Sequence, residues 1–154
     1  MRYKINLRLA PKFKQTLPPQ RLREAARAAL EYEGVALPGE LTIVVTEDAE
    51  LQRLNREYLG HDYATDVLSF PSDEIDPDTG GRYWGDIALS LPRAKAQARA
   101  GGHPLMAEVR LLIVHGVLHL LGHDHAKPKD KARMWAAQAE ILRQLKSPLT
   151  GPAL

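Results

Sequence analysis

The feature that most constrains this chain is a cluster of four histidines between residues 115 and 125, in the segment HGVLHLLGHDH. His115 and His119 are four residues apart, so on a helix their rings project from one face, about 6 Å apart along the axis. Two imidazoles placed in this way can bind one ion at metal–nitrogen distances of about 2.0–2.1 Å. The surrounding apolar residues predict a buried helix, where an imidazole without a partner is costly. The pattern therefore predicts a metal site.

Helix geometry indicates which histidine completes the site. His123 continues the four-residue spacing, but at about 1.5 Å per residue it lies about 12 Å along the axis from His115, too far for one ion to join both. Gly122 can adopt the left-handed conformation that ends a helix, which lets the chain turn back. His125 follows this turn at a distance that can reach the same ion. We therefore predict one zinc ion per chain, bound by His115, His119 and His125.

The spacing is that of a metzincin-type metalloprotease, His-Glu-x2-His-x2-Gly-x2-His, with one difference. Gly116 stands where those proteases have the glutamate that serves as general base. Without that carboxylate, peptide hydrolysis loses a proton transfer worth about 10²–10⁴-fold, which disfavours a protease. Three histidines with an open fourth position are still typical of a catalytic site. The proposed nucleophile is zinc-bound water with a pKa of about 7, and no side chain is assigned as catalytic acid or base.

Composition narrows the class of protein further. Because the chain has no cysteine, any transition metal must be held by histidine and carboxylate. The length of 154 residues suits one domain with its own core. No segment approaches the ~18 apolar residues of a membrane span, and the first residues lack a signal-peptide pattern, so we expect a cytoplasmic protein without a membrane partner. A net charge of +2 does not by itself indicate nucleic-acid binding, and the oligomeric state is left open.

Hydrophobic periodicity predicts both strands and helices along the chain. Strands are expected at residues 2–9, 41–45, 66–70 and 84–91, and helices at 19–33, 48–59, 92–101, 104–122 and 128–145. This order predicts an α+β fold in which a small mixed sheet packs with several helices, and the metal-binding helix lies near the C-terminus. We expect one compact domain over residues 1–146 and a frayed tail at 147–154.

The histidine segment is similar to the hallmark H-G-x-L-H-L-x-G-Y-D-H of the YbeY family of bacterial rRNA maturation factors, regarded as metal-dependent endoribonucleases. Further matches are TDVLSF at residues 65–70, GDI at 85–87 and EVRL at 108–111. The resemblance implies a compact α+β fold and one zinc ion on the three histidines. It also implies a cytoplasmic role in rRNA processing and ribosome quality control, with RNA, meaning rRNA and ribosomal particles, as the partner.

The chain departs from the family pattern in two places. His123 replaces the usual tyrosine, which adds either a further imidazole near the metal or a surface ring. Leu59 stands where many members carry an arginine thought to help with RNA, so that role is not carried over. His61, two residues later, is a conceivable substitute, although a loop histidine is also expected to be exposed and without a role.

Three carboxylates are candidates for supporting the metal ligands. Asp66 is expected either to orient a ligand histidine or to cap a strand, and Asp86 allows the same two interpretations. Asp124 is expected to support the turn before His125 or to hydrogen-bond a ligand ring. Trp135 is expected in the core or at its rim. The basic residues at 127–133 are either a solvated face or contacts for an RNA backbone.

The sequence thus favours a zinc-dependent endoribonuclease that cleaves single-stranded RNA during rRNA maturation. A second hypothesis is a ribosome-assembly binding protein whose metal is mainly structural, in which case removal of the metal unfolds the protein. A third is another non-proteolytic metal hydrolase, acting on small phosphorylated or amide substrates, which a narrow closed pocket would favour.

Overall fold

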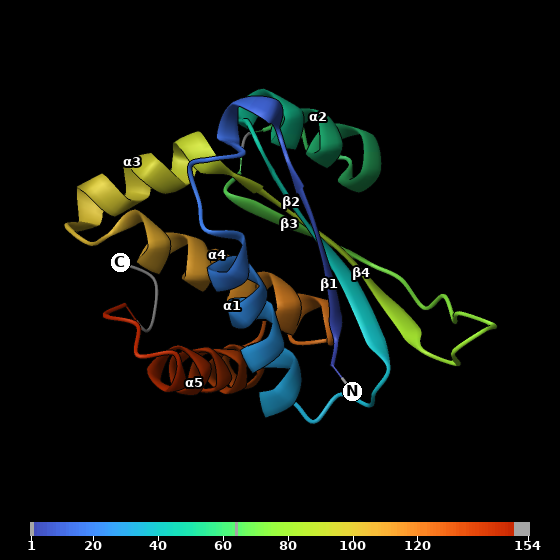
Figure 1. The fold of residues 1–154 in the computed structure, drawn as a ribbon. Coiled ribbons are helices and arrows are strands. Elements are labelled where there is room, and N and C mark those ends of the chain that lie inside the picture. Colours follow the sequence, from blue (N-terminus) through green and yellow to red (C-terminus); the bar gives the residue numbers. More distant parts are fainter. Residues whose placement is uncertain (1, 64, 150–154) are drawn as a thin grey trace.

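The computed structural model describes residues 2–63 and 65–149, which form one mixed sheet and five α-helices (Figure 1). The elements are, in chain order, β1 (Lys4–Leu9), a 3-10 turn (Pro11–Phe13), α1 (Pro19–Tyr32), β2 (Gly39–Thr46), α2 (Asp48–Leu59), β3 (Val67–Pro71), β4 (Arg82–Ser90), α3 (Leu91–Gly101), α4 (Leu105–Leu120) and α5 (Pro128–Gln144). The strand order is β1-β2-β4-β3. Strands β1, β2 and β4 are parallel, and β3 pairs antiparallel with β4. The predicted α+β fold is confirmed.

The two faces of the sheet are covered by different helices (Figure 1). Side chains alternate between the faces of a strand, so Ile87 and Leu89 of β4 enter the main core with α1, α4 and α5. Ala88, between them, points to the other face and packs with Leu51 of α2 and Leu68 of β3. The histidine helix α4 therefore lies on the α1 side of the sheet.

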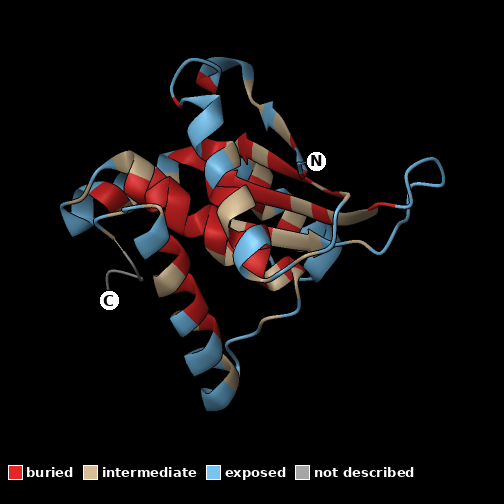
Figure 2. Ribbon diagram, turned by 60° about the horizontal axis from the view of Figure 1, so that its bottom comes forward, coloured by how far each residue is buried: buried red, intermediate tan, exposed pale blue. Residues whose placement is uncertain are grey.

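Helix α4 is the centre of the main core. It contacts β3 and β4 on one side and α1, α3 and α5 on the others. Its sequence LMAEVRLLIVHGVLHL is apolar around most of its circumference, the composition expected of a helix enclosed by other elements. Buried residues gather where the helices meet the sheet, whereas the tip of the β3–β4 connection is exposed (Figure 2).

Gly116 sets how closely α4 approaches β4. A Cβ atom at this position would lie 2.8 Å from Cγ2 of Ile87, well inside van der Waals contact. The glycine that replaces the protease glutamate in the motif thus faces the sheet, where a glutamate side chain has no room. Ser69 of β3 adds a polar contact at the same place, because its hydroxyl donates to the Gly116 carbonyl at 3.0 Å.

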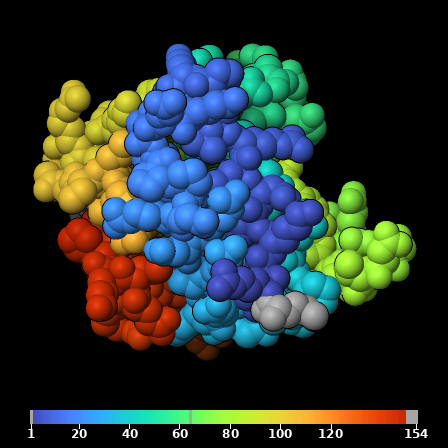
Figure 3. All heavy atoms as spheres, viewed as in Figure 1, coloured from blue at the N-terminus to red at the C-terminus, as the bar shows by residue number. Residues whose placement is uncertain are grey.

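Two segments lie at the periphery of the fold. The connection between β3 and β4 projects from the body as a hairpin (Figures 1 and 3), in which the Ser72 amide donates to the Trp84 carbonyl at 2.9 Å.

Of the predicted tail, Ser147 donates its amide to the Leu142 carbonyl at 3.0 Å, and Leu149 packs against the core. The remaining tail residues, 150–154, lie outside the described residues. Within the described ranges, every helix is too short or too polar to cross a membrane.

We expect Gly116→Ala to lower the free energy of unfolding by about 1 kcal/mol, because overpacking costs about 1–3 kcal/mol and outweighs the helix propensity of alanine. Urea denaturation measures the change. The matched control is the same substitution in an Ile87→Ala background, which removes the atoms that the new Cβ would meet. There the loss should disappear, and an equal loss in both backgrounds would show that the contact with β4 is not the cause.

Candidate metal centre

Three histidines converge beside the C-terminal half of α4. Their ligand atoms, one from each of His115, His119 and His125, all lie within 4.8 Å of one another. The ring centroids are 4.7 Å apart for His115 and His119, and 5.1 Å apart for His119 and His125. His115 and His119 are half-buried, whereas His125 is exposed. The structure therefore brings together the three residues that the spacing selected.

The chain turns back at Gly122, as its position in the motif predicts. Gly122 has φ of 100°, in the left-handed region that favours glycine. Its amide donates to the His119 carbonyl at 3.0 Å, and the next amide, of His123, donates to the Leu118 carbonyl at 2.9 Å. These bonds satisfy carbonyl groups at the helix end, and the turn directs His125 back toward α4.

Asp124 supports this turn. Its Oδ1 accepts hydrogen bonds from the amides of His125, at 2.7 Å, and Ala126, at 3.3 Å. A carboxylate that accepts from the following backbone amides holds a loop in one conformation. Of the two interpretations given for Asp124, the contacts favour support of the turn.

Gln138 of α5 holds the ring of His115, a role that no sequence pattern indicated. Its Oε1 accepts from Nδ1 of His115 at 3.0 Å, and the glutamine side chain is fully buried. Because Nδ1 carries the proton in this bond, the lone pair at Nε2 is free to bind a metal. A hydrogen bond of this kind is usual for metal-binding histidines. The signal was weak, since a glutamine in an amphipathic helix has no characteristic spacing to the histidine motif.

Trp135, also on α5, covers one side of the cluster. Its ring centroid lies 5.8 Å from that of His115 and 5.6 Å from that of His125. The ring is partly buried at the rim of the main core, in agreement with the prediction. Lys131, one turn earlier, places Nζ 5.6 Å from the same indole ring. A positive charge therefore lies beside the indole ring that covers the histidines.

Burial keeps the half-buried imidazoles neutral. It lowers the pKa of His115 below its usual value of 6.5. Burial is also the main cause that lowers the pKa of His119 to about 4, and the neighbouring rings of His115 and His125 lower it further. At neutral pH both rings therefore carry free lone pairs, which metal binding requires.

The histidines line a cleft of about 450 Å³ whose other wall is the segment from Thr65 to Ser69 and Pro71. Asp66 is part of that wall, beside His115. Its carboxylate accepts from Gln97 Nε2 at 3.4 Å, and its backbone carbonyl accepts from the Ser90 amide at 3.0 Å. Of the two interpretations of Asp66, the contacts favour the one at the strand, because its carbonyl anchors the start of β3. Its side chain lines the cleft and, among the described residues, has no hydrogen bond to a ligand histidine.

Two other predicted neighbours of the metal lie elsewhere. Asp86 alternates with Ile87 along β4, so its side chain points to the opposite face of the sheet, where it accepts a hydrogen bond from Tyr83. The interpretation that Asp86 orients a metal ligand was therefore wrong. His123 pairs through Nε2 with Glu33 at the end of α1. Its ring contacts Glu33 and not the cluster, so the interpretation of His123 as a further imidazole near the metal was wrong.

The region of the missing family arginine lies apart from the cleft. Leu59 ends α2 and is 44% exposed. His61 is exposed, and its ring lies 5.5 Å from that of Tyr63. Neither residue lines the histidine cleft. The structure therefore gives His61 no contact with the candidate metal centre.

The residues present fit a metal ion of the zinc type. Three imidazoles suit zinc and related transition metals, and rotations of the rings would bring ligand atoms now within 4.8 Å of one another to bonding distance from one ion. The cluster offers three ligands and faces an open cleft. This is the arrangement of a catalytic rather than a closed structural site.

The fold and the cluster together define an α+β protein with a candidate three-histidine metal centre at the mouth of a cleft. A sequence model of the family described as endoribonuclease YbeY matches residues 10–146. The endoribonuclease YbeY of Roseiflexus sp. (strain RS-1) is 43% identical over 147 residues, covering 92% of each chain. That of Solibacter usitatus (strain Ellin6076) is 56% identical over 91 residues, covering 59% of this chain and 56% of the relative. The chain belongs to the YbeY family.

A solved structure agrees with the fold. The solution structure of a Thermotoga maritima protein, TM1509, superimposes with a TM-score of 0.56 at 20% sequence identity, covering 95% of this chain and 94% of the other. At this identity the similarity concerns the fold alone.

We expect Gln138→Leu to weaken zinc binding by about 10–100-fold, because His115 loses the acceptor that fixes its tautomer and orientation. Isothermal titration calorimetry measures the affinity, and ¹⁵N chemical shifts of the His115 ring report its tautomer. Gln144→Leu, at an exposed position of the same helix, is the matched control. Unchanged affinity and tautomer in Gln138→Leu would mean that the hydrogen bond has no role in metal binding.

Proposed function

We propose that this chain is a zinc-dependent endoribonuclease that cleaves single-stranded segments of rRNA during maturation and ribosome quality control in the cytoplasm. Its relatives carry the name endoribonuclease, and its family membership extends over most of the chain. The observation that carries the proposal is the open cleft in which His115, His119 and His125 converge.

In this proposal His115, His119 and His125 hold the metal. When bound, a zinc ion would supply Lewis-acid polarisation of a phosphoryl oxygen and a lowered pKa for water. Gln138 would keep the His115 lone pair directed at the ion, and Asp124 would hold the turn that carries His125. These supports lie on α5 and on the loop before it, so the site depends on how these segments pack against α4.

The surroundings of the histidines support an RNA substrate. Lys131 lies beside Trp135, where its charge would attract the phosphates of a polynucleotide. Trp135 would exclude water from one side of the imidazoles. The cleft wall includes Val67, Leu68 and Ser69 of β3, which is an edge strand of the sheet. An extended single strand fits such a cleft better than a small, enclosed substrate does.

The glycine at position 116 argues against peptide hydrolysis. A metzincin has a glutamate at this position, whereas in this fold a side chain there would clash with Ile87. Apolar residues of five other elements enclose α4, so its packing rests on the main core rather than on the histidine cluster. This supports a metal that serves chemistry rather than folding.

The experiment compares zinc-loaded protein, chelator-stripped protein and His119→Ala on an rRNA fragment with single-stranded segments, with folding followed by circular dichroism. We expect cleavage by the zinc-loaded protein alone, recovery when zinc is returned to the stripped protein, and similar helix content in all three. The reason is that the ligands hold the reactive centre and not the core.

Equal cleavage by all three samples would contradict the metal-dependent nuclease. Cleavage by none of them, together with unfolding of the stripped protein, would instead favour an assembly protein with a structural metal.

A further inference from the structure

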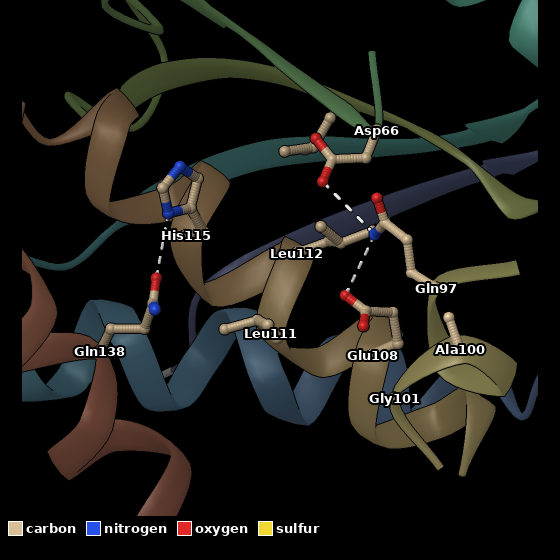
Figure 4. A pocket seen from close by; sticks show the side chains of 10 residues that line it. Asp66, Gln97, Ala100, Gly101, Glu108, Leu111, Leu112, His115 and Gln138 are labelled. Atoms are coloured by element: carbon tan, nitrogen blue, oxygen red, sulfur yellow. Dashed lines mark hydrogen bonds between the residues drawn. The ribbon is translucent and has the colours of Figure 1, made fainter. Parts of the chain in front are cut away.

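A second cavity adjoins the histidine cleft (Figure 4). It measures about 340 Å³ and shares Asp66, Val67 and His115 with the first cleft. This volume lies in the range of about 300–1,000 Å³ that is typical of small-molecule sites. A group bound in the second cavity would therefore lie directly beside the candidate metal centre. The proposed function leaves this cavity without a role.

One end of the cavity holds two carboxylates in fixed positions. Gln97 Nε2 donates to Asp66 Oδ2 at 3.4 Å and to Glu108 Oε2 at 3.3 Å, so one amide bridges both acids (Figure 4). His103 Nε2 lies 2.9 Å from Glu108 Oε1. Glu108 is only 4% exposed. Because a carboxylate offers about four acceptor positions, each acid can still accept hydrogen bonds from a ligand.

The other end offers a hydrogen-bond donor. The Nε2 group of Gln138 is buried and makes no hydrogen bond with the described part of the chain, although Oε1 of the same side chain holds His115. A buried donor without an acceptor is costly, so it marks a place where a ligand or water would bind. Figure 4 shows Gln138 and His115 at one end of the cavity and the acids at the other.

Between the two ends the walls are apolar. Leu111 and Leu112 of α4 lie between the polar groups (Figure 4), and Ala100 and Gly101 of α3 form part of the rim. An apolar slot with acceptors at one end and a donor at the other suits a flat, polar-edged ring. The carboxylates would repel a phosphate, which directs the RNA backbone to the histidine cleft and leaves this cavity for another part of the nucleotide.

We propose that this cavity binds an unpaired nucleobase of the RNA, next to the phosphate that lies at the histidines, and that guanine is its preferred occupant. The inference rests on the proposed function and names the part of the substrate that sets its sequence preference. The N1–H and amino group of guanine donate to Asp66 and Glu108, and its O6 and N7 accept from Gln138. Uracil lacks an amino group, and its one N3–H lies between two carbonyl oxygens that the same acids would repel. Unpaired bases are commonly recognised by such edge contacts.

The test is a titration of zinc-loaded protein with guanosine and with uridine, followed by ¹H–¹⁵N NMR. We expect guanosine to shift the amide signals of Ala100, Gly101 and Leu112 and to bind roughly tenfold more tightly than uridine. Ala100→Leu fills the rim of the cavity from an exposed position and should weaken guanosine binding. Ala96→Leu, exposed on the same helix but away from the cavity, is the matched control and should bind guanosine as the wild type does.

Nucleosides carry no phosphate, so this readout is independent of RNA cleavage. Guanosine binding by a protein that cleaves no RNA would leave the base site standing and remove the nuclease proposal. Three results would overturn the base site, even in a protein that cleaves RNA: equal binding of guanosine and uridine, guanosine binding that Ala100→Leu leaves unchanged, or no binding of either nucleoside.

Discussion

The close packing of α4 against β4 is the constraint on which the rest of the structure depends. At Gly116 the helix backbone approaches Ile87 so closely that a Cβ atom has no room, and the residues around it are enclosed by other elements. A helix held on all sides has little freedom to rotate or shift. His115 and His119, on either side of this glycine, are therefore presented toward the cleft from a rigid support.

The other contributors to the site reach it from segments that pack against α4. The loop after Gly122 carries His125 and is held by Asp124, and α5 contributes Gln138 and Trp135. The arrangement explains why buried glutamine occurs in an otherwise apolar interface: its carbonyl oxygen satisfies the His115 ring and leaves the second nitrogen for a metal. The same side chain lines the adjoining cavity and carries an amide nitrogen that is unpaired within the described part of the chain, so it links the candidate metal centre to the proposed base site.

Much of the fold and the centre of the site could be predicted from the sequence, because both depend on local patterns. The four-residue spacing of His115 and His119 and the glycine before His125 are governed by helix geometry alone. The strand order could not be predicted in the same way, since it depends on pairing between distant segments. That pairing also extends β4 back to Arg82, two residues before the predicted start, where it lies beside Gly39.

The supporting residues were harder to predict, for different reasons. Gln138 lies 23 residues from the histidine that it contacts, and no spacing rule connects α5 to α4. The prediction that Asp86 lies near the metal was wrong, although strand alternation indicates the correct face. Ile87 faces the core, so the side chain of Asp86, the residue before it, points to the opposite face of the sheet. His123 pairs with Glu33 because the end of α1 lies beside the turn after α4, a contact that depends on the tertiary structure.

The central claim is that His115, His119 and His125, without His123, bind one metal ion. It is tested most directly by measuring the zinc content and affinity of the purified wild type, His125→Ala and His123→Ala. The structure predicts one zinc ion per chain for the wild type and for His123→Ala with equal affinity, and much weaker binding for His125→Ala. Loss of zinc from His123→Ala with full retention by His125→Ala would contradict it.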